Sequence, residues 1–221
     1  EGADLATVTD EIARAWGLGL MIVPVTCDRV RTMVTLADDD ADGMGADALP
    51  AGREIEFQEY FVRRRHAVPV TAIRIDGAER ARPSGGVLEA LAAAEAIVIA
   101  PSNPLVSIGP VLAVAGVREA VVARRGSVVA VSPIVAGSAL KGPADRMLVE
   151  LGHEPSVVGV ARLYAGIAGT LVIDEADADR AAEVEAEGLR CVVTPTVMRT
   201  PEAAAALART SLAAVGVETH R

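Results

Sequence analysis

The second half of the sequence alternates short apolar runs with segments of helical periodicity, and this alternation restricts the fold more than any other feature. Four apolar runs are predicted as strands, at 96–100, 127–131, 169–173 and 189–193. Helices are predicted at 86–94 (with Ser84 as its cap), in segments up to 122, and at 144–151, 156–164, 178–187 and 202–214. Short apolar strands that alternate with helices form parallel sheets covered on both faces. The pattern predicts an α/β fold with a doubly wound, mostly parallel sheet.

Residues 1–80 follow a different pattern. A helix is predicted near 7–16, with Ile12, Ala13 and Trp16 on its apolar face and Trp16 in the core. Further predicted elements are strands at 20–25, 30–36, 53–58 and 70–75, a helix-like segment at 59–66 and a solvated acidic loop at 38–50. We therefore interpret 26–80 as a strand-rich insertion or subdomain within a single domain, 1–221.

Composition excludes several classes of protein. Apolar residues make up 51% of the chain and charged residues 23%, which excludes a disordered chain. The net charge of -9 predicts no nucleic-acid partner. The most apolar stretch, 90–117, is broken by Glu95, Asn103 and three prolines, so no membrane span is predicted. Two distant cysteines predict a reduced, cytoplasmic protein. Three histidines without metal-ligand spacing predict no metal site within 1–221.

Two loops follow predicted strands, where ligands bind in open α/β sheets. The first, 100–110, contains Ser102, Asn103, Pro104, Ser107 and Gly109. A loop of small polar residues that turns into a helix presents backbone N–H groups and a positive dipole end, which suits a phosphate. Ser102 and Asn103 add side-chain donors. The alternative is that Ser102 and Asn103 only cap the helix.

The second loop, 132–146, holds the only lysine of the chain, Lys141. It stands beside a Gly-Pro pair at a predicted helix start, where it can pair with a ligand phosphate. The alternative is an ordinary exposed lysine. A third candidate is the turn 28–32, whose Asp28, Arg31 and Thr32 suit a polar ring or a diphosphate. Its alternative is a surface ion pair that stabilises little.

No catalytic side chains can be assigned from the sequence. The three scattered histidines allow no Ser-His-Asp, Cys-His or metal triad to be assembled. Catalysis by positioning and electrostatics is therefore favoured over a covalent nucleophile, and the catalytic residues stay unknown.

Five segments together resemble the 2-phospho-L-lactate transferase family, which includes CofD in archaea and FbiA in mycobacteria and makes the deazaflavin coenzyme F-420. They occur in order along the chain: 28–34 (DRVRTMV), 57–65 (FQEYFVRRR), 99–110 (IAPSNPLVSIGP), 132–147 (SPIVAGSALKGPADRM) and 158–174 (VGVARLYAGIAGTLVID). The combination is specific, although each segment alone is weak.

The resemblance implies a Rossmann-like core, a divalent metal, usually magnesium, and a defined reaction. The family moves a phospholactyl or phosphoenolpyruvyl group from a guanosine diphosphate conjugate to the deazaflavin alcohol Fo and releases GMP. The residues implied for the donor are Ser102, Asn103, Pro104, Ser107, Gly109 and Lys141; those implied for Fo are Asp28, Arg31 and Thr32. We also expect a homodimer.

The sequence departs from the family pattern in places. Family members begin with a strand, a Gly-rich loop and acidic residues that hold the metal, and none of these precedes Glu1. We therefore expect a chain that lacks its N-terminal Gly-rich βα unit and the magnesium ligands, and that is inactive alone. Ala136 stands where a glycine is expected, and Cys27 where an acidic residue is usual.

Two other interpretations stay open. CofD-like proteins of the gluconeogenesis-factor type bind nucleotide sugars and regulate without transferase activity. They carry a Gly-Ser-Leu-Tyr-Thr-Ser type of motif at the phosphate loop, whereas this chain has Ser102-Asn103-Pro104, which favours the transferase branch. The other interpretation is an unrelated Rossmann-like nucleotide-binding domain.

Overall fold

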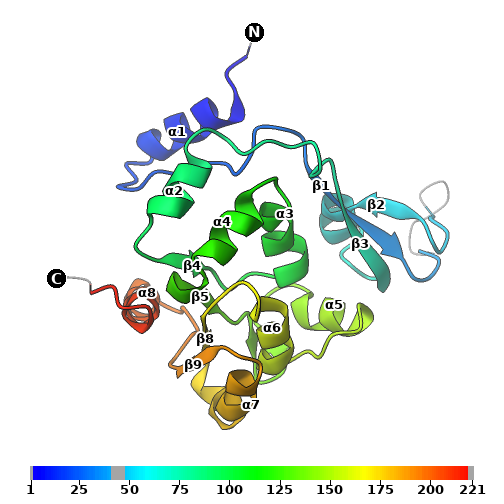
Figure 1. Cartoon of the computed structure of the whole chain (residues 1–221). Helices are drawn as coiled ribbons and strands as arrows, with labels where there is room; N and C mark the ends of the chain where they lie inside the picture. Colours follow the sequence, from blue (N-terminus) through cyan, green and yellow to red (C-terminus); the bar gives the residue numbers. More distant parts are fainter. Residues whose placement is uncertain (1, 41–47, 219–221) are drawn as a thin grey trace.

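The computed structural model describes residues 2–40 and 48–218, so part of the predicted acidic loop, 41–47, lies outside the described residues. A parallel sheet with its helices forms the larger part of the molecule, and a small antiparallel sheet lies beside it (Figure 1).

The parallel sheet confirms the predicted α/β class. Its strands are β4 (Ile97–Ile99), β5 (Val128–Val131), β8 (Thr170–Ile173) and β9 (Arg190–Val193). They lie in the order β4-β5-β8-β9, and every pair is parallel. The carboxyl ends of all four strands therefore meet at one edge of the sheet.

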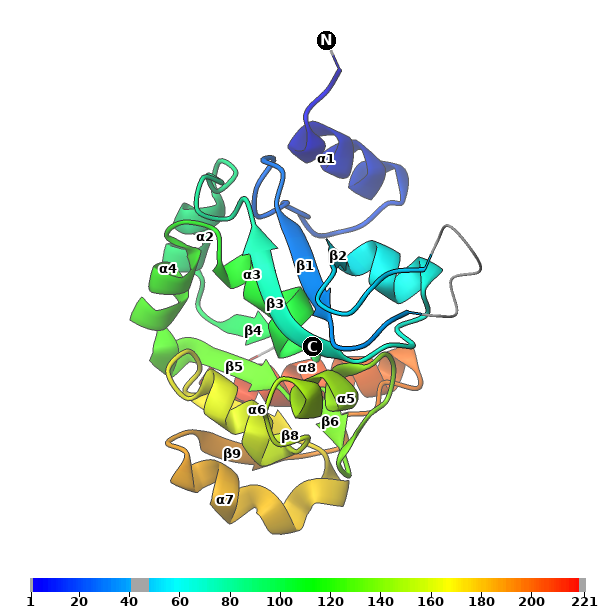
Figure 2. The same cartoon turned by 90° about the vertical axis from the view of Figure 1, so that its right-hand side faces the viewer.

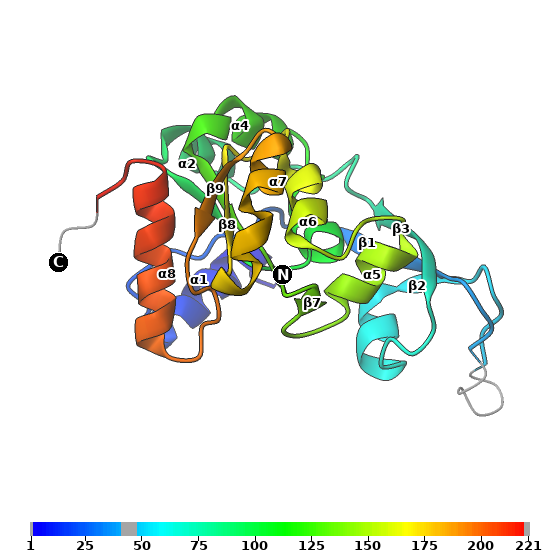
Figure 3. The ribbon, with the colours of Figure 1, turned by 90° about the horizontal axis from the view of Figure 1, so that it is seen from below.

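Helices cover both faces of this sheet because side chains alternate along the buried strands. One face packs with α2 (Val87–Ala93), α4 (Val117–Ala123), α6 (Val157–Tyr164) and α7 (Ala181–Ala186), through Val128, Ala130, Leu171 and Ile173. The other face packs with α8 (Pro201–Ala214), through Val129, Val131, Val172 and Leu207. Figure 3 shows α8 and the α6–α7 pair on opposite sides of β8 and β9.

Shorter elements connect the strands on this framework. After β4 come a π-helical turn, η3 (Pro104–Ile108), and α3 (Gly109–Leu112). The 3₁₀ turn η4 (Arg125–Ser127) precedes β5. After β5 come a small hairpin, β6 (Ile134–Val135) and β7 (Ser138–Ala139), and α5 (Ala144–Glu150). A 3₁₀ segment, η5 (Glu175–Arg180), follows β8.

The antiparallel sheet comes from the region predicted to be rich in strands. β1 (Arg31–Leu36) lies between β2 (Glu54–Glu56) and β3 (Val70–Asp76), and the π-helical turn η2 (Glu59–Arg63) follows β2 (Figure 2). A second core joins this sheet to η3 and α5 through Val34, Leu36, Ile55, Tyr60, Val70, Val106 and Met147. Whether 26–80 is a separate unit stays a prediction.

Three expectations for the N-terminal half are wrong. The helix α1 (Leu5–Ala15) forms, but Trp16 is 77% exposed and not in the core, because α1 lies at the periphery (Figure 1). Residues 20–25 form no strand in the described part of the chain, since the bond from the Ser84 N–H to the Val25 carbonyl oxygen at 2.9 Å does not extend into a ladder and Pro24 has no N–H to donate. Ser84 does not cap α2; Gly86, with φ +85°, holds the N-cap position without a side-chain bond.

No single helix among residues 2–40 and 48–218 is long and apolar enough to cross a membrane. The segments Pro104–Leu112 and Val117–Ala123 reach that length and hydropathy only together, and they are bent by 95° relative to each other.

Candidate functional site

A cavity of about 1040 Å³ lies where β4, β5 and β9 end. Its walls come from four segments: η2 and the residues before it, the loop after β4, the segment from β5 to α5, and the loop after β9. This is the edge of the sheet at which open α/β folds bind ligands. The lining residues used below are Phe57, Phe61, Val62, Ser102, Asn103, Ser107, Ser132, Leu140, Lys141, Gly142, Thr196, Met198 and Arg199.

The charge of the cavity is opposite to that of the chain. Lys141 and Arg199 line it, and no acidic side chain is among its described lining residues. Neither cation forms an ion pair with a carboxylate within 2–40 and 48–218. The net charge of the chain is -9. Two unpaired cations in a concave site of an acidic protein favour the binding of an anionic ligand.

The structure brings four of the six predicted donor residues to this cavity: Ser102, Asn103, Ser107 and Lys141. Pro104 is buried in η3, and Gly109 begins α3, so both shape the loop without lining the cavity. A Cβ at Gly109 would lie 3.2 Å from the Pro104 carbonyl oxygen. Gly109 therefore permits the tight transition from η3 to α3.

Asn103 caps the helical turn, which confirms the alternative interpretation for Asn103 but not for Ser102, whose side chain forms no capping bond among the described residues. Its Oδ1 accepts hydrogen bonds from the backbone N–H of Leu105 at 2.9 Å and of Val106 at 3.3 Å. Its Nδ2 lies 3.8 Å from the thioether sulfur of the buried Met147. Two backbone N–H groups that the sequence argument offered to a phosphate are thus already bonded. The side-chain hydroxyls of Ser102 and Ser107, in the same wall, form no hydrogen bond within residues 2–40 and 48–218.

Two buried carboxylates fix the loops around the cavity. Asp174 Oδ2 accepts hydrogen bonds from Thr196 N at 2.7 Å and Thr196 Oγ1 at 2.9 Å, which anchors the loop after β9. Asp177 Oδ2 accepts a bond at 2.9 Å from the N–H of Ala136, in the hairpin turn after β6. Burial raises the pKa of Asp174, but the hydrogen bonds from Thr196 and Ala176 lower it more, so the pKa lies below its ordinary value of 3.8.

The backbone of the hairpin turn shows why a glycine is expected at position 136, where this chain has alanine. Ala136 has φ +49° and Gly137 has φ +76°, between strands β6 and β7. Two-residue hairpin turns with positive φ at both positions strongly favour glycine. Ala136 therefore occupies a position where a glycine would be less strained.

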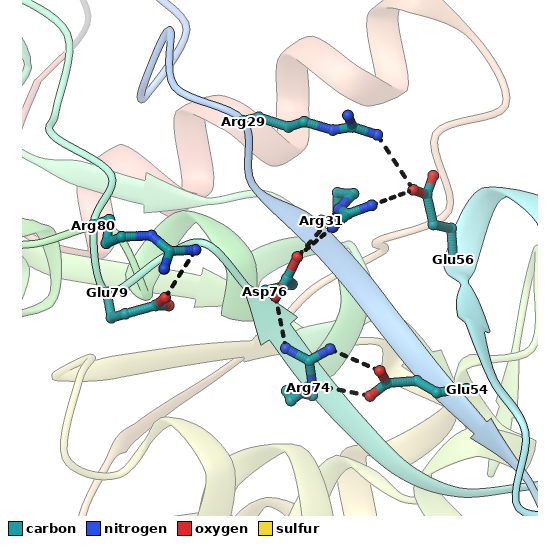
Figure 4. A network of polar contacts seen from close by, with 8 residues as sticks. All are labelled: Arg29, Arg31, Glu54, Glu56, Arg74, Asp76, Glu79 and Arg80. Atoms are coloured by element: carbon teal, nitrogen blue, oxygen red, sulfur yellow. Dashed lines mark hydrogen bonds and ion pairs between the residues drawn. The ribbon is translucent and has the colours of Figure 1, made fainter.

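The three residues implied for Fo lie away from this cavity. Arg31, on β1, donates to Asp76 Oδ2 from Nη2 at 2.6 Å and to Glu56 Oε1 from Nη1 at 3.0 Å (Figure 4). Asp28 Oδ2 accepts a bond from the N–H of Arg82 at 2.8 Å. Asp28, Arg31 and Thr32 line no part of the cavity, and Arg31 belongs to an ion-pair network of the antiparallel sheet. Their role toward Fo stays a prediction.

The lining does not fit a magnesium ion. Magnesium prefers carboxylate and water oxygens, and no Asp, Glu, His or Cys is among the described residues of the lining. In the described ranges as a whole, no group of three or more such side chains gathers to hold a metal.

Sequence reasoning missed two parts of the wall. The loop after β9 contributes Thr196, Met198 and Arg199, and the signal was available, because a strand there also ends in a polar loop before a helix. The segment around η2 contributes Phe57 and Phe61, the only two phenylalanines of the chain. In a sequence this poor in aromatic residues, two phenylalanines four positions apart were a usable signal.

The fold and the cavity define a class: an α/β protein with a Rossmann-like parallel sheet and a cationic ligand cavity at the carboxyl edge of that sheet. Comparison with known protein families identifies the family within this class. The family model of 2-phospho-L-lactate transferase CofD matches residues 1–208. The chain belongs to this family.

Similar proteins of known name agree with that assignment. The chain is 41% identical over 212 residues to the phosphoenolpyruvate transferase of Streptomyces griseus, and 42% identical over 214 residues to that of Kitasatospora aureofaciens. Each match covers 96% of this chain, and it covers 64% of the first relative and 63% of the second. The chain thus spans less than two thirds of the length of these relatives.

Solved structures support the fold. Two crystal structures of the protein BH3568 from Bacillus halodurans, a member of the UPF0052 family, superpose with TM-scores of 0.55 and 0.54 at 14% sequence identity. They cover 90% and 89% of this chain, and 62% of the solved chain in each case. At this identity the likeness establishes a shared fold.

Proposed function

We propose that this chain is the donor-binding part of a transferase of coenzyme F-420 biosynthesis. The proposed reaction moves a phosphoenolpyruvyl or phospholactyl group from a guanosine diphosphate conjugate to the deazaflavin alcohol Fo, with release of GMP. The observation that carries the proposal is the cationic cavity, in which Lys141 and Arg199 line the same space as Ser102 and Ser107. The names of the relatives favour phosphoenolpyruvate as the transferred group.

The chemistry of such a transfer matches the side chains of the cavity. The acceptor hydroxyl oxygen bonds to the phosphorus that carries the enolpyruvyl or lactyl group, and its proton passes to solvent. The bond from that phosphorus to the bridging oxygen breaks, and GMP leaves. This step needs charge neutralisation and alignment more than a protein nucleophile. Lys141 and Arg199 would neutralise the diphosphate, and the Ser102 and Ser107 hydroxyls would orient it.

In the proposed function, Asn103 acts on the donor indirectly, by holding the loop that carries Ser102 and Ser107. Its side chain holds the turn of the loop through Leu105 and Val106, so that Ser102 and Ser107 stay on the cavity wall. Asp174 holds the loop after β9 in the same way, through its two hydrogen bonds with Thr196. Both are positioning residues.

We include magnesium in the proposed function because the family resemblance implies a divalent metal. When bound, it would supply additional positive charge toward the diphosphate. Since the described lining does not fit the ion, we propose that its ligands lie in the N-terminal part of the longer relatives. A cytoplasmic location is proposed from the two distant cysteines, and a homodimeric state from the family resemblance.

The direct experiment measures GMP release and formation of the Fo conjugate with a phosphoenolpyruvyl guanosine diphosphate donor, with and without magnesium. Two proteins are compared: the 221-residue chain, and a fusion that carries ahead of it the N-terminal segment of the Streptomyces griseus relative. We expect magnesium-dependent turnover from the fusion and none from the chain alone. A fusion that folds and binds GDP but releases no GMP from the donor would contradict the proposal.

The regulatory alternative is less well supported. Its motif is absent at Ser102-Asn103-Pro104, and the relatives named above are called transferases. Binding of UDP-sugars in preference to GDP would favour it.

A further inference from the structure

A cluster of polar side chains joins two walls of the cavity from behind. Arg146 and Glu150 lie on α5, and Tyr60 lies on η2. Arg146 Nη2 donates to Tyr60 Oη at 2.5 Å, and Arg146 Nε lies 2.8 Å from Glu150 Oε1. Glu150 Oε2 accepts a hydrogen bond at 3.0 Å from the N–H of Val70, the first residue of β3. Tyr60 Oη in turn donates to the Val68 carbonyl oxygen at 2.9 Å. The cluster therefore connects α5 both to η2 and to the antiparallel sheet.

The centre of this cluster is shielded from water. Tyr60 is fully buried, and the Glu150 side chain is 11% exposed. A carboxylate with so little access to water needs charged and polar partners. Compared with apolar side chains of similar volume, a buried ion pair adds little stability. Its charged hydrogen bonds, however, are directional and permit few arrangements. The cluster is thus better suited to fixing a geometry than to stabilising the fold.

Both ends of the cluster adjoin residues that line the cavity. On the η2 side, Phe57, Phe61 and Val62 line it, and the ring centroids of Phe57 and Tyr60 are 6.2 Å apart. On the α5 side, the segment from Leu140 to Ala144 lines it. A Cβ built on Gly142 would lie 3.8 Å from Phe61 Cε2, so the two walls also touch at this point. Tyr60, Arg146 and Glu150 themselves are not among the described lining residues.

The helix α5 connects this cluster to Lys141. Lys141 lies three residues before Ala144, where α5 begins. The Met147 N–H donates to the Pro143 carbonyl oxygen at 2.8 Å, which holds Pro143 on the first turn of the helix. The buried Met147 side chain also contacts Asn103, whose Nδ2 lies 3.8 Å from its sulfur. A displacement of α5 would therefore move Lys141 relative to the loop after β4.

We propose that Tyr60, Arg146 and Glu150 are positioning residues that hold Lys141 against the diphosphate of the donor. This inference rests on the proposed function and deepens it. Group transfer depends on alignment, and a misplacement of about 1 Å can cost on the order of 100-fold in rate. The three side chains line no part of the cavity, so their effect on the donor passes through α5 to Lys141.

The test measures GDP binding to the 221-residue chain by titration calorimetry. Tyr60→Phe keeps the ring and the net charge and removes the oxygen that bonds to Arg146. Arg146→Gln removes the ion pair with Glu150. Substitutions in a network that does not touch the ligand change coupled binding by roughly 2- to 30-fold, and we expect a loss of GDP affinity in that range for each variant.

Arg74→Gln is the matched control. Arg74 is also paired with two carboxylates, Glu54 and Asp76, but on the antiparallel sheet and away from the cavity lining (Figure 4). Its replacement removes the same charge as Arg146→Gln and should change GDP affinity less than 2-fold. Urea unfolding establishes that each variant is folded, and Tyr60→Phe keeps the test decisive where Arg146→Gln does not fold.

The same substitutions in a Lys141→Gln background test the route of the effect. Residues that act through one another have non-additive effects, whereas independent effects add. We expect Tyr60→Phe and Arg146→Gln to change GDP affinity less than 2-fold once Lys141 is replaced. A general loosening of the cavity would instead lower affinity by the same factor in both backgrounds.

The outcomes separate the inference from the proposed function. Wild-type GDP affinity in folded Tyr60→Phe, together with a loss in Lys141→Gln, would overturn the inference and leave the donor site standing. Equal losses in both backgrounds would overturn it as well, and so would an equal loss in Arg74→Gln. A chain that binds no GDP, or that keeps full affinity in Lys141→Gln, would overturn the inference together with the role of Lys141 in the proposed function.

Discussion

Replacing Asn103 tests whether this residue acts as a helix cap or as a ligand contact. Asn103→Ala removes the acceptor of two backbone hydrogen bonds, from Leu105 at 2.9 Å and Val106 at 3.3 Å. Loss of an N-cap side chain typically costs about 1 kcal/mol, and up to ~2 kcal/mol when the site is partly buried. We expect the free energy of unfolding to fall by about 1–2 kcal/mol, and GDP to bind several-fold more weakly because the Ser102–Ser107 loop loosens.

The serine variant separates the two roles. Serine caps helices about as well as asparagine, so Asn103→Ser should restore stability to within about 0.5 kcal/mol of wild type and restore GDP affinity with it. Urea unfolding and titration calorimetry provide the two readouts. A serine variant that is as stable as wild type, yet binds GDP as poorly as Asn103→Ala, would refute the cap argument and show that the amide itself contacts the ligand.

Three further outcomes follow from the contacts. Ala136→Gly should raise the free energy of unfolding by about 1 kcal/mol, since it relieves a φ of +49°; a loss of stability in urea unfolding would count against the turn assignment. Because the pKa of Asp174 is lower in the folded chain than 3.8, its contribution is complete above about pH 4 and is lost as pH falls through the folded value. Stability measured from pH 2 to 7 should therefore drop less steeply at low pH in Asp174→Asn, and an unaltered acid limb would contradict this. Asp174→Ala, which removes both acceptor oxygens, should also weaken GDP binding, because Thr196 loses its anchor; a folded variant with wild-type affinity would exclude that role.

The parallel sheet could be predicted from sequence because its strands are buried on both faces. Such strands are almost entirely apolar, as in Val128–Val131 and in Leu171, Val172 and Ile173 of β8. The segment 20–25 is also mostly apolar, but it contains Pro24 and forms no strand in the structure. A strand requires a neighbouring strand with free N–H and C=O groups, and local composition carries no information about such a partner.

The candidate site was predictable only in part. Loops after apolar strands could be found from the sequence, and Ser102, Ser107 and Lys141 of these loops line the cavity, while their binding of a donor stays a prediction. Asn103 Oδ1 accepts bonds from two backbone N–H groups, and this depends on the exact conformation of the turn. From the sequence alone, a ligand contact and a helix cap were both possible for Asn103. The ion pairs of Arg31 could not be assigned from the sequence, because its partners, Asp76 and Glu56, are 45 and 25 positions away. Only strand register brings them together.

The central claim is that the cationic cavity binds the guanosine diphosphate end of the donor. The most direct measurement is titration calorimetry of GDP against the wild-type chain, the double variant Lys141→Gln/Arg199→Gln and a matched double variant, Arg118→Gln/Arg209→Gln. The matched variant removes the same charge from two exposed arginines outside the cavity. We predict saturable GDP binding to wild type, a loss of at least tenfold in the first variant and a change below threefold in the second. Equal losses in both variants, or full GDP affinity without Lys141 and Arg199, would contradict the claim.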